Sequence, residues 1–252
     1  MEYSYKTKAE ECLKSTVPIY NTFNRYYNIH GSGVLIDAGP LKAIATATHV
    51  LEDDQKGLFL PGEKEIFQFT GEVIENKNKI ADIGLMILED AVFYEINKTY
   101  KPVDLNNMMI NGEGNNEYDE FFVAGYPKAK NSYRQQYKNP GFFKNYPRKL
   151  FTHEAEDFVY KRFKEFDRNN HLIVSHTNTK NNARKKIKLS HPGGLSGSGF
   201  WGLNRKTKSY ELCGIGTDYR PKAHPTHLVA VRFKLLVFFI HQRLKSNVDK
   251  YD

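Results

Sequence analysis

The segment GGLSGSGFWG, residues 193–202, places glycines at fixed offsets around Ser196. Glycine permits tight turns and the close approach of a ligand to the main chain. In an acyl-transfer enzyme such a turn directs two backbone N–H groups to one point, where they stabilise the oxyanion of a tetrahedral intermediate. Ser196 would supply the attacking oxygen. A Gly/Ser-rich turn without chemistry has the same composition, so the motif alone leaves both interpretations open.

A serine hydroxyl is a weak nucleophile at neutral pH, and it needs a neighbouring base, usually a histidine oriented by a carboxylate. His49 is the best candidate for this base, because it follows a β-like run in ATATHVLEDD and begins a short helical turn. The other eight histidines lack such a setting. Histidines at strand ends also serve as ordinary polar residues, so His49 by itself is only a candidate.

The third candidate is Asp82, which opens an apolar run in KIADIGLMIL. A carboxylate in this setting would be partly buried and would need a partner, because burial of an unpaired charge is costly. A protonated imidazole is a suitable partner, and an exposed aspartate at a strand start is the alternative. Asp53 and Asp54 compete with Asp82 for this role, but both follow His49 closely in a polar stretch.

The order His, Asp, Ser resembles the chymotrypsin-like (trypsin-like) serine peptidases, especially the disulfide-free bacterial branch that includes HtrA and the glutamyl endopeptidases. The resemblance runs over residues 17–244, in the segments GSGVLI (31–36), TATHV (46–50), ADIGLMIL (81–88), FVAGYP (122–127), GLSGSG (194–199) and CGIGTDY (213–219). It implies a serine endopeptidase without cofactor or metal. Ser196 would be the nucleophile, His49 the general base and then general acid, and Asp82 the group that orients His49.

The resemblance also assigns the backbone N–H groups of Gly194 and Ser196 to an oxyanion hole. Ser198 is a competing nucleophile in the same motif, but Ser196 holds the aligned position, two residues after the hole glycine. The primary pocket should be lined by Leu189–Pro192 and by the strand that pairs with the substrate backbone. The residues expected to bind substrate are Ser190, His191, Thr217, Asp218 and Tyr219.

The sequence says less about which substrate side chain this pocket prefers than about which residues line it. Ser190 aligns with the base of the pocket and carries no charge, so a demand for Arg or Lys has no acidic counterpart unless Asp218 turns inward. His191 is a candidate for recognising acidic or amide side chains, although a loop histidine is more often solvated. The sequence therefore predicts a peptide substrate without naming the preferred residue.

The chain departs from the family at two positions. Digestive members are activated when a freed N-terminal amine pairs with an Asp just before the serine, but this position is Leu195 here. The residue after the histidine is Val50 instead of the cysteine of disulfide-bonded relatives. We expect restraint by substrate choice or by a regulatory partner protein. Stand-alone trypsin-like domains in bacterial stress or antiphage-defence operons offer an analogy.

Composition limits the broad class of protein. The 252 residues carry 37 Lys plus Arg against 29 Asp plus Glu, a net charge of +8, and 40% are hydrophobic, which excludes a disordered chain. The first residues lack a secretory signal, and the longest apolar segment, 235–240, is far below the roughly 20 residues of a membrane span. Cys12 and Cys213 are expected to be reduced thiols. We therefore expect a cytoplasmic protein without a membrane partner.

The elements that would position these residues are mostly short strands. Apolar or alternating runs separated by turns predict an all-β fold, with runs at 33–36, 42–46, 65–74, 82–88, 120–125, 171–175, 199–203, 211–215 and 228–233. Helices are expected at 8–16, at 154–166 and at 234–244, where Leu235, Phe238, Phe239 and Ile240 would form a broad apolar face. Long loops are expected at 128–147.

The resemblance implies two six-stranded antiparallel Greek-key β-barrels, a trypsin-like double barrel, with a short N-terminal helix and a C-terminal helix. The expected division is a helical extension over 1–16, a first barrel over 17–110, and a second barrel with the C-terminal helix over 111–252. The Asn- and Gly-rich stretch 106–119 is the best candidate for the linker between the two halves.

The alternative to an enzyme is a catalytically silent, protease-like module that binds nucleic acid or an acidic protein. Its best support is the basic run KNNARKKIK, residues 180–188, which would attract polyanions, although such runs are more often solvated loops. The aromatic-rich segment 133–150 lacks an RNA-binding signature, so we expect no nucleic-acid partner. A metal hydrolase is disfavoured because neither HExxH nor CxxC spacing occurs.

Overall fold

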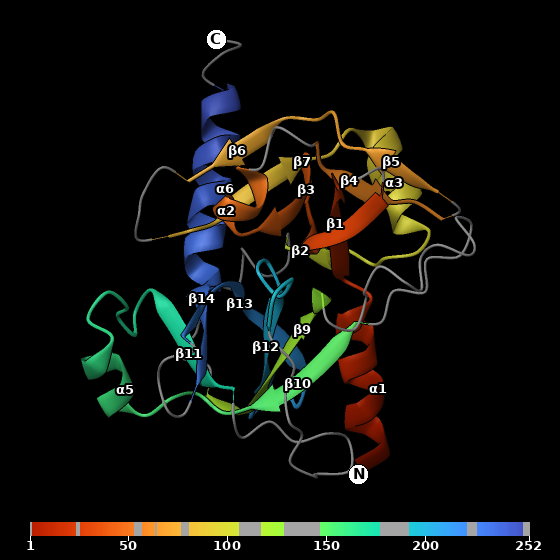
Figure 1. Ribbon diagram of the computed structural model, residues 1–252. Helices are drawn as coiled ribbons and strands as arrows, with labels where there is room; N and C mark the ends of the chain where they lie inside the picture. The colour runs from red at the N-terminus through yellow and green to blue at the C-terminus, as the bar shows by residue number, and fades with distance from the viewer. Residues whose placement is uncertain are drawn as a thin grey trace.

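The computed structural model describes residues 2–23, 26–52, 57–63, 65–76, 81–105, 117–128, 147–176, 192–220 and 226–248. Over these residues the chain is mostly β, and two curled antiparallel sheets form half-barrels that lie one above the other (Figure 1). Helix α1 (Glu2–Leu13) lies near the N-terminus, and helix α6 (Phe233–Val248) lies at the C-terminal end. The expected β-rich chain with a helix at each end is confirmed.

The first sheet follows the N-terminal half of the chain and has the strand order β5-β4-β1-β2-β3-β7-β6, with β8 paired in parallel to β2. Its strands are β1 (Thr16–Phe23), β2 (Tyr26–Ala38), β3 (Leu41–Thr46), β4 (Phe59–Pro61), β5 (Ile66–Gln68), β6 (Val73–Glu75), β7 (Gly84–Ile87) and β8 (Val103–Asp104). Two helices connect its strands, α2 (Thr48–Leu51) and α3 (Asp90–Asn97).

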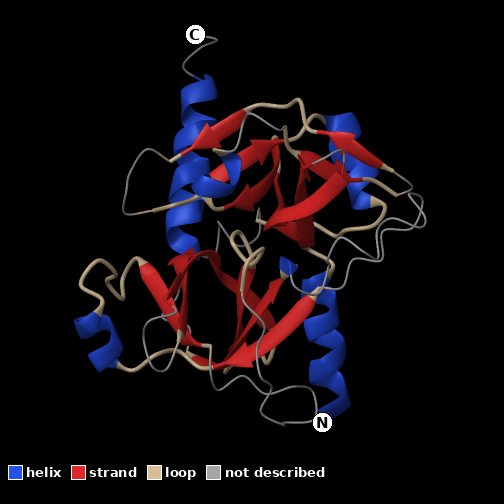
Figure 2. Cartoon of the chain, viewed as in Figure 1, coloured by secondary structure: helices blue, strands red, loops and turns tan. Residues whose placement is uncertain are grey.

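The second sheet has the order β10-β9-β12-β13-β14-β11. Its strands are β9 (Tyr118–Gly125), β10 (Arg148–Thr152), β11 (His171–Ser175), β12 (Gly199–Asn204), β13 (Tyr210–Arg220) and β14 (His227–Arg232). Helix α5 (Asp157–Arg162) connects β10 to β11. In Figure 2 the strands separate into an upper and a lower group, and α6 runs from the lower group along the side of the upper one.

A shared core holds the two half-barrels together. Val34 and Ala45 of the first sheet belong to the same buried cluster as Phe122, Ala124 and Ile215 of the second. Their side chains are apolar and almost fully buried, and burial of apolar surface is the main favourable contribution to folding. The core therefore fixes the relative position of the two sheets, and any site between them is held rigidly.

Several predicted elements have different bounds in the structure. The single run predicted at 65–74 is two strands, β5 and β6, which are separated at Gly71. Strand β7 begins at Gly84, so Asp82 precedes the strand instead of opening it. The C-terminal helix is longer than predicted. Of its predicted apolar face, Leu235, Phe239 and Ile240 belong to or pack against the core, whereas Phe238 is 60% exposed. The predicted helix at 154–166 is only α5.

Both cysteines are free and buried, which confirms the prediction of two reduced thiols. Burial raises the pKa of Cys12 to about 12, and it raises the pKa of Cys213 to about 12 as well. Thiols with such pKa values are inert at neutral pH. In the part of the chain that the structure describes, no helix has the length and apolar character to cross a membrane. Most of the expected linker, residues 106–116, and the basic run 180–188 lie outside the described residues.

Candidate active site

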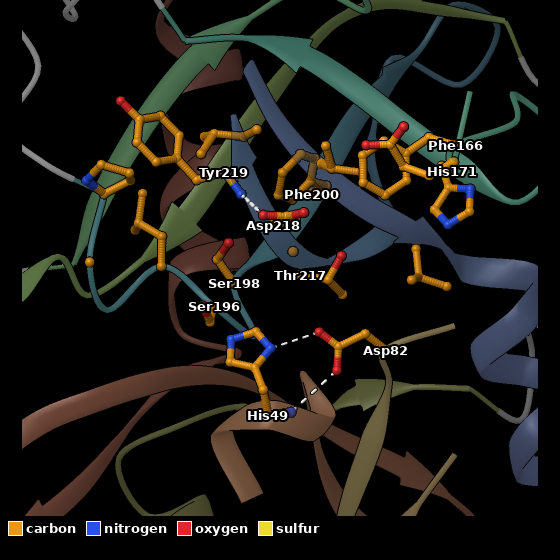
Figure 3. A pocket seen from close by; sticks show the side chains of 18 residues that line it. His49, Asp82, Phe166, His171, Ser196, Ser198, Phe200, Thr217, Asp218 and Tyr219 are labelled. Carbon is orange, nitrogen blue, oxygen red and sulfur yellow. Dashed lines mark hydrogen bonds and ion pairs between the residues drawn. The ribbon is translucent and has the colours of Figure 1, made fainter. Parts of the chain in front are cut away.

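His49 and Asp82 meet at the start of helix α2. The residue that precedes this helix, Ala47, has no side chain that can cap it. The Asp82 carboxylate takes this role from outside the helix, because its Oδ1 accepts the backbone N–H of His49 at 3.2 Å. Its Oδ2 lies 2.7 Å from Nδ1 of the same histidine (Figure 3). One carboxylate thus positions both the helix and the imidazole ring.

The His49–Asp82 pair is partly open to solvent, with side-chain exposures of 44% and 36%. The hydrogen bond to Asp82 is the main reason that the pKa of His49 is raised above 6.5, and burial of the ring partly opposes it. A neutral His49 that donates Nδ1–H to Asp82 keeps Nε2 as a hydrogen-bond acceptor. The ring is therefore arranged to accept a proton on the side away from Asp82.

Ser196 lies on that side of the His49 ring, opposite Asp82 (Figure 3). All three residues line one cavity of about 630 Å³. No hydrogen bond joins Ser196 to His49 among the described residues. In free enzymes such bonds are often long, and they tighten when the substrate binds. The structure thus places the three predicted side chains in one cavity, but it does not show a hydrogen bond between Ser196 and His49.

The backbone before Ser196 leaves two N–H groups without a hydrogen-bond partner among the described residues. The carbonyl of Gly193 accepts the N–H of Lys128 at 2.7 Å, and the carbonyl of Leu195 accepts the N–H of Ser198 at 2.9 Å. In a planar trans peptide the N–H points opposite to the carbonyl. The N–H groups of Gly194 and Ser196 therefore point away from these partners, and neither bonds to another described residue. Both remain able to bind an anion.

Two glycines are required for this backbone shape. Gly194 has φ of +92° and Gly197 has φ of +82°, which side chains rarely adopt. A Cβ atom at Gly194 would lie 2.5 Å from the carbonyl oxygen of Tyr126. A Cβ atom at Gly197 would collide with the carbonyl oxygen of Ser32 and with the hydroxyl of Thr46. The fixed glycine offsets in the sequence thus reflect both backbone geometry and close packing.

Ser32 on β2 is a residue that the sequence analysis missed. Its hydroxyl donates to the carbonyl of Gly194 at 2.8 Å and accepts the N–H of Tyr126 at 2.9 Å. Its backbone N–H donates to the carbonyl of Ser196 at 2.8 Å, and its carbonyl accepts the hydroxyl of Thr46, also at 2.8 Å. Ser32 is fully buried. This serine therefore ties the loop around Ser196 to the first half-barrel, which carries His49.

The predicted substrate-binding residues are only partly described. Thr217, Asp218 and Tyr219 of β13 line the cavity, next to an irregularity in the pairing of β13 with β14. Ser190 and His191 lie outside the described residues. The cavity also includes residues that were not predicted, among them Glu165 and Phe166, which lie between α5 and β11, and His171, the first residue of β11. These three residues lie far from Ser196 in the sequence, and no local sequence pattern predicted that they would line the same cavity.

No protein-family model matches the chain, and no curated protein matches it. The site is therefore interpreted from its own geometry. No group of three or more His, Cys, Asp or Glu side chains that could hold a metal ion occurs in the described ranges. The arrangement consists of a partly buried His–Asp pair, a serine across the ring, and two unpaired N–H groups next to that serine.

Proposed function

We propose that this chain is a serine endopeptidase of the trypsin-like kind, and that it hydrolyses peptide bonds through an acyl-enzyme. The observation that carries the proposal is the cavity in which Ser196 faces the His49–Asp82 pair from across the imidazole ring. The N–H groups of Gly194 and Ser196 supply the remaining requirement, a site for the oxyanion. These parts are the ones that acyl transfer by a serine needs.

In the proposed reaction, Ser196 Oγ attacks the substrate carbonyl while Nε2 of His49 takes its proton. The carbonyl oxygen becomes an oxyanion, which accepts hydrogen bonds from the two N–H groups. When this intermediate collapses, the C–N bond breaks and His49 gives the proton to the departing amine. A water molecule, deprotonated by His49, then attacks the ester. The bond between the acyl carbon and Oγ of Ser196 breaks, His49 returns the proton to Oγ, and the carboxylic acid product leaves. Asp82 holds the ring and stabilises its protonated form.

The proposal extends to the finer architecture. We propose that the two half-barrels are the two Greek-key barrels of a trypsin-like peptidase, with residues 17–110 supplying His49 and Asp82 and residues 111–252 supplying Ser196; the first sheet has eight strands instead of the six expected. The proposal includes a bacterial, intracellular enzyme that acts on selected proteins and is held in check by substrate choice or by a partner. A defence role of such an enzyme remains an analogy to other stand-alone domains of this type.

Labelling with a fluorophosphonate probe tests the proposal. The folded protein should form one covalent adduct, and peptide mass spectrometry should place it on Ser196, because only an activated serine reacts with such a probe. Heat-denatured protein is the control and should not react. No adduct on the folded protein would contradict the peptidase and favour the silent binding module, whereas an adduct on another serine would contradict the assignment of Ser196 as nucleophile.

The pH dependence provides a second test. His49 acts as a base only when it is neutral, so kcat/KM should rise with pH, with a midpoint above 6.5 because the pKa of His49 is raised. In Asp82→Asn the hydrogen bond to a carboxylate is lost, so the midpoint should move to lower pH while the rate falls. The exposed His153, replaced by Gln, is the control and should leave the midpoint unchanged. A midpoint that Asp82→Asn does not move would contradict this assignment.

A further inference from the structure

The turn of residues 193–197, which carries Ser196, is anchored through its carbonyl groups. The four carbonyls of residues 193–196 each accept a hydrogen bond. Two of the four donors belong to Ser32 of β2, in the opposite half-barrel. Its hydroxyl donates to the carbonyl of Gly194, and its backbone N–H donates to the carbonyl of Ser196, both at 2.8 Å. Ser32 therefore supplies half of the hydrogen bonds that hold these carbonyls.

The peptide group that the Ser32 hydroxyl binds lies between the two unpaired N–H groups. It joins Gly194 to Leu195, whereas the unpaired N–H groups belong to Gly194 and Ser196. Its carbonyl accepts the hydroxyl of Ser32, and its N–H, on Leu195, donates to the carbonyl of Pro192 at 2.9 Å. A peptide group is planar, so its rotation would break both hydrogen bonds at once. The orientation of this peptide therefore sets the direction of one unpaired N–H relative to the other.

Glycine at position 194 makes the turn possible but does not by itself maintain it. Gly194 has φ of +92°, and a glycine residue populates other backbone conformations about as readily. Leu195 is buried in the apolar core of the second half-barrel, so its side chain contributes packing without a hydrogen bond. Hydrogen bonds from outside the turn are therefore needed to select the observed conformation, and the Ser32 hydroxyl supplies one.

The orientation of the Ser32 hydroxyl is determined by its two partners. Ser32 is fully buried, its one hydroxyl proton goes to Gly194, and its oxygen accepts the N–H of Tyr126 at 2.9 Å. Tyr126 is buried as well, and its own hydroxyl donates to the carbonyl of Thr16. Loss of the Ser32 hydroxyl would leave a buried C=O and a buried N–H without this partner, which is unfavourable. The carbonyl of Gly194 can find another donor only if its peptide turns.

We infer that Ser32 is a positioning residue for the proposed reaction, and that its hydroxyl holds the turn of residues 193–197 in the form that binds an oxyanion. The inference rests on the proposed peptidase function. Ser32 does not line the cavity, so it acts through the N–H groups of Gly194 and Ser196. These groups meet a negative oxygen only after Ser196 has attacked, so Ser32 should affect the transition state and leave substrate binding unchanged.

Ser32→Ala tests this role by steady-state hydrolysis of a peptide amide, for which KM approaches Kd when the chemical step is slow. We expect kcat to fall by about ten- to a hundredfold while KM changes by less than about twofold. This loss is smaller than the roughly 10²–10³-fold loss on deletion of an oxyanion donor, because both N–H groups remain and only their direction changes. A kcat within about threefold of wild type would overturn the inference and leave the peptidase function intact.

Thr152→Val is the matched control for loss of a buried hydroxyl. Thr152 of β10 is buried, its hydroxyl donates to the carbonyls of His153 and Ser175, and it does not line the cavity. Valine keeps the shape of the side chain. Both variants should have a lower melting temperature, because each loses a buried hydrogen bond, but only Ser32→Ala should lose kcat. An equal loss of kcat in both would contradict a specific role for Ser32.

Ser32→Cys provides the same test if Ser32→Ala does not fold. The thiol occupies the place of the hydroxyl and remains a weak donor, so kcat should fall less than in the alanine variant, again without a change in KM. A wild-type kcat in Ser32→Cys would show that the turn needs no strong donor at this position. That result would overturn the inference.

Two inhibitors with one peptide sequence give an independent measure of oxyanion binding. In a peptidyl boronic acid, Oγ of Ser196 bonds to boron, its proton passes to His49, and an anionic tetrahedral boronate forms. The matching peptide carboxamide binds without a covalent bond. Ser32→Ala should weaken the boronate by about the same factor as kcat/KM and leave the carboxamide unchanged. Equal weakening of both inhibitors would mean that Ser32 shapes the substrate site, which would overturn the inference.

Hydrogen exchange keeps the inference testable if the chain hydrolyses no peptide. The N–H groups of Leu195 and Gly197 donate to the carbonyls of Pro192 and Gly216. Both should exchange at least about tenfold faster in Ser32→Ala and at the wild-type rate in Thr152→Val, because only the first variant releases the turn. Unchanged exchange in Ser32→Ala would overturn the inference. Absence of hydrolysis and of Ser196 labelling in the wild type, with the faster exchange retained in the variant, would contradict only the peptidase function.

Discussion

Replacement of Ser196 by alanine is expected to reduce peptide hydrolysis by about three to six orders of magnitude. The Oγ atom of Ser196 is the only group in the proposed reaction that forms a covalent bond to the substrate. Without it, the N–H groups of the loop and the substrate site can still stabilise attack by water, which leaves a small residual rate. The measurement is steady-state hydrolysis of a fluorogenic peptide, with active sites titrated in the wild type.

Two other serines provide the comparisons for this experiment, Ser209 as a control and Ser198 as the alternative nucleophile. Ser209 lies in the turn between β12 and β13, where its hydroxyl contacts Thr207, and Ser209→Ala should leave hydrolysis unchanged. Ser198 is the alternative nucleophile within the motif, but its hydroxyl is buried, whereas Ser196 lies across the ring of His49. If Ser196→Ala kept more than about a tenth of the wild-type rate, the assignment of the nucleophile would be wrong.

Local sequence patterns were sufficient to predict three candidate residues of the site. Glycine offsets around Ser196, a histidine at a strand end and an aspartate before an apolar run are local patterns, and the structure brings these three residues to one cavity. Ser32 could not be identified in the same way. Its hydroxyl donates to the carbonyl of Gly194, which lies 162 residues away in the sequence. No local pattern around a serine in an apolar strand predicts such a distant partner.

The fold was predicted well where hydrophobic periodicity dominates, and poorly elsewhere. Strand β1 was not predicted, and it contains Pro18, a residue that cannot donate to a sheet ladder and that is unusual in an inner strand. In the structure Pro18 nevertheless pairs with Ser32, next to an irregularity at Ile19 and Tyr20. A similar register shift separates Gly216 from Asp218 in the pairing of β13 with β14. Irregular pairings of this kind arise from tertiary packing, so periodicity does not reveal them.

The second large effect is expected for Gly197→Ala. The φ of +82° strains any residue with a Cβ atom, and the added methyl group would collide with the carbonyl oxygen of Ser32 and the hydroxyl of Thr46. Both partners are buried parts of the first half-barrel, so they cannot move aside cheaply. Strain and overpacking together should lower the free energy of unfolding by about 2–6 kcal/mol.

The collision would also push the loop that carries Ser196 away from the half-barrel that carries His49. Hydrolysis in Gly197→Ala should therefore fall by about a hundredfold or more even at temperatures where the variant is folded, since a small misplacement of a reacting group costs about that much. Denaturant unfolding gives the stability, and fluorophosphonate labelling of the folded fraction gives the activity. A folded variant that labels at the wild-type rate would contradict the close packing of this loop.

Gly57→Ala is the matched control, because it separates backbone strain from collision. Gly57 also has a positive φ, +68°, but the nearest atom to a Cβ there would be Nε2 of Gln68, at 3.0 Å, and the next, Cε2 of Phe59, would lie at an ordinary contact distance of 3.6 Å. The Nε2 atom ends a flexible side chain, so this variant should lose only the strain energy, about 1–2 kcal/mol, and keep its activity. Equal losses in the two variants would mean that φ alone constrains Gly197. A larger loss at Gly197, together with lost labelling, is expected if contact with Ser32 sets the position of the nucleophile.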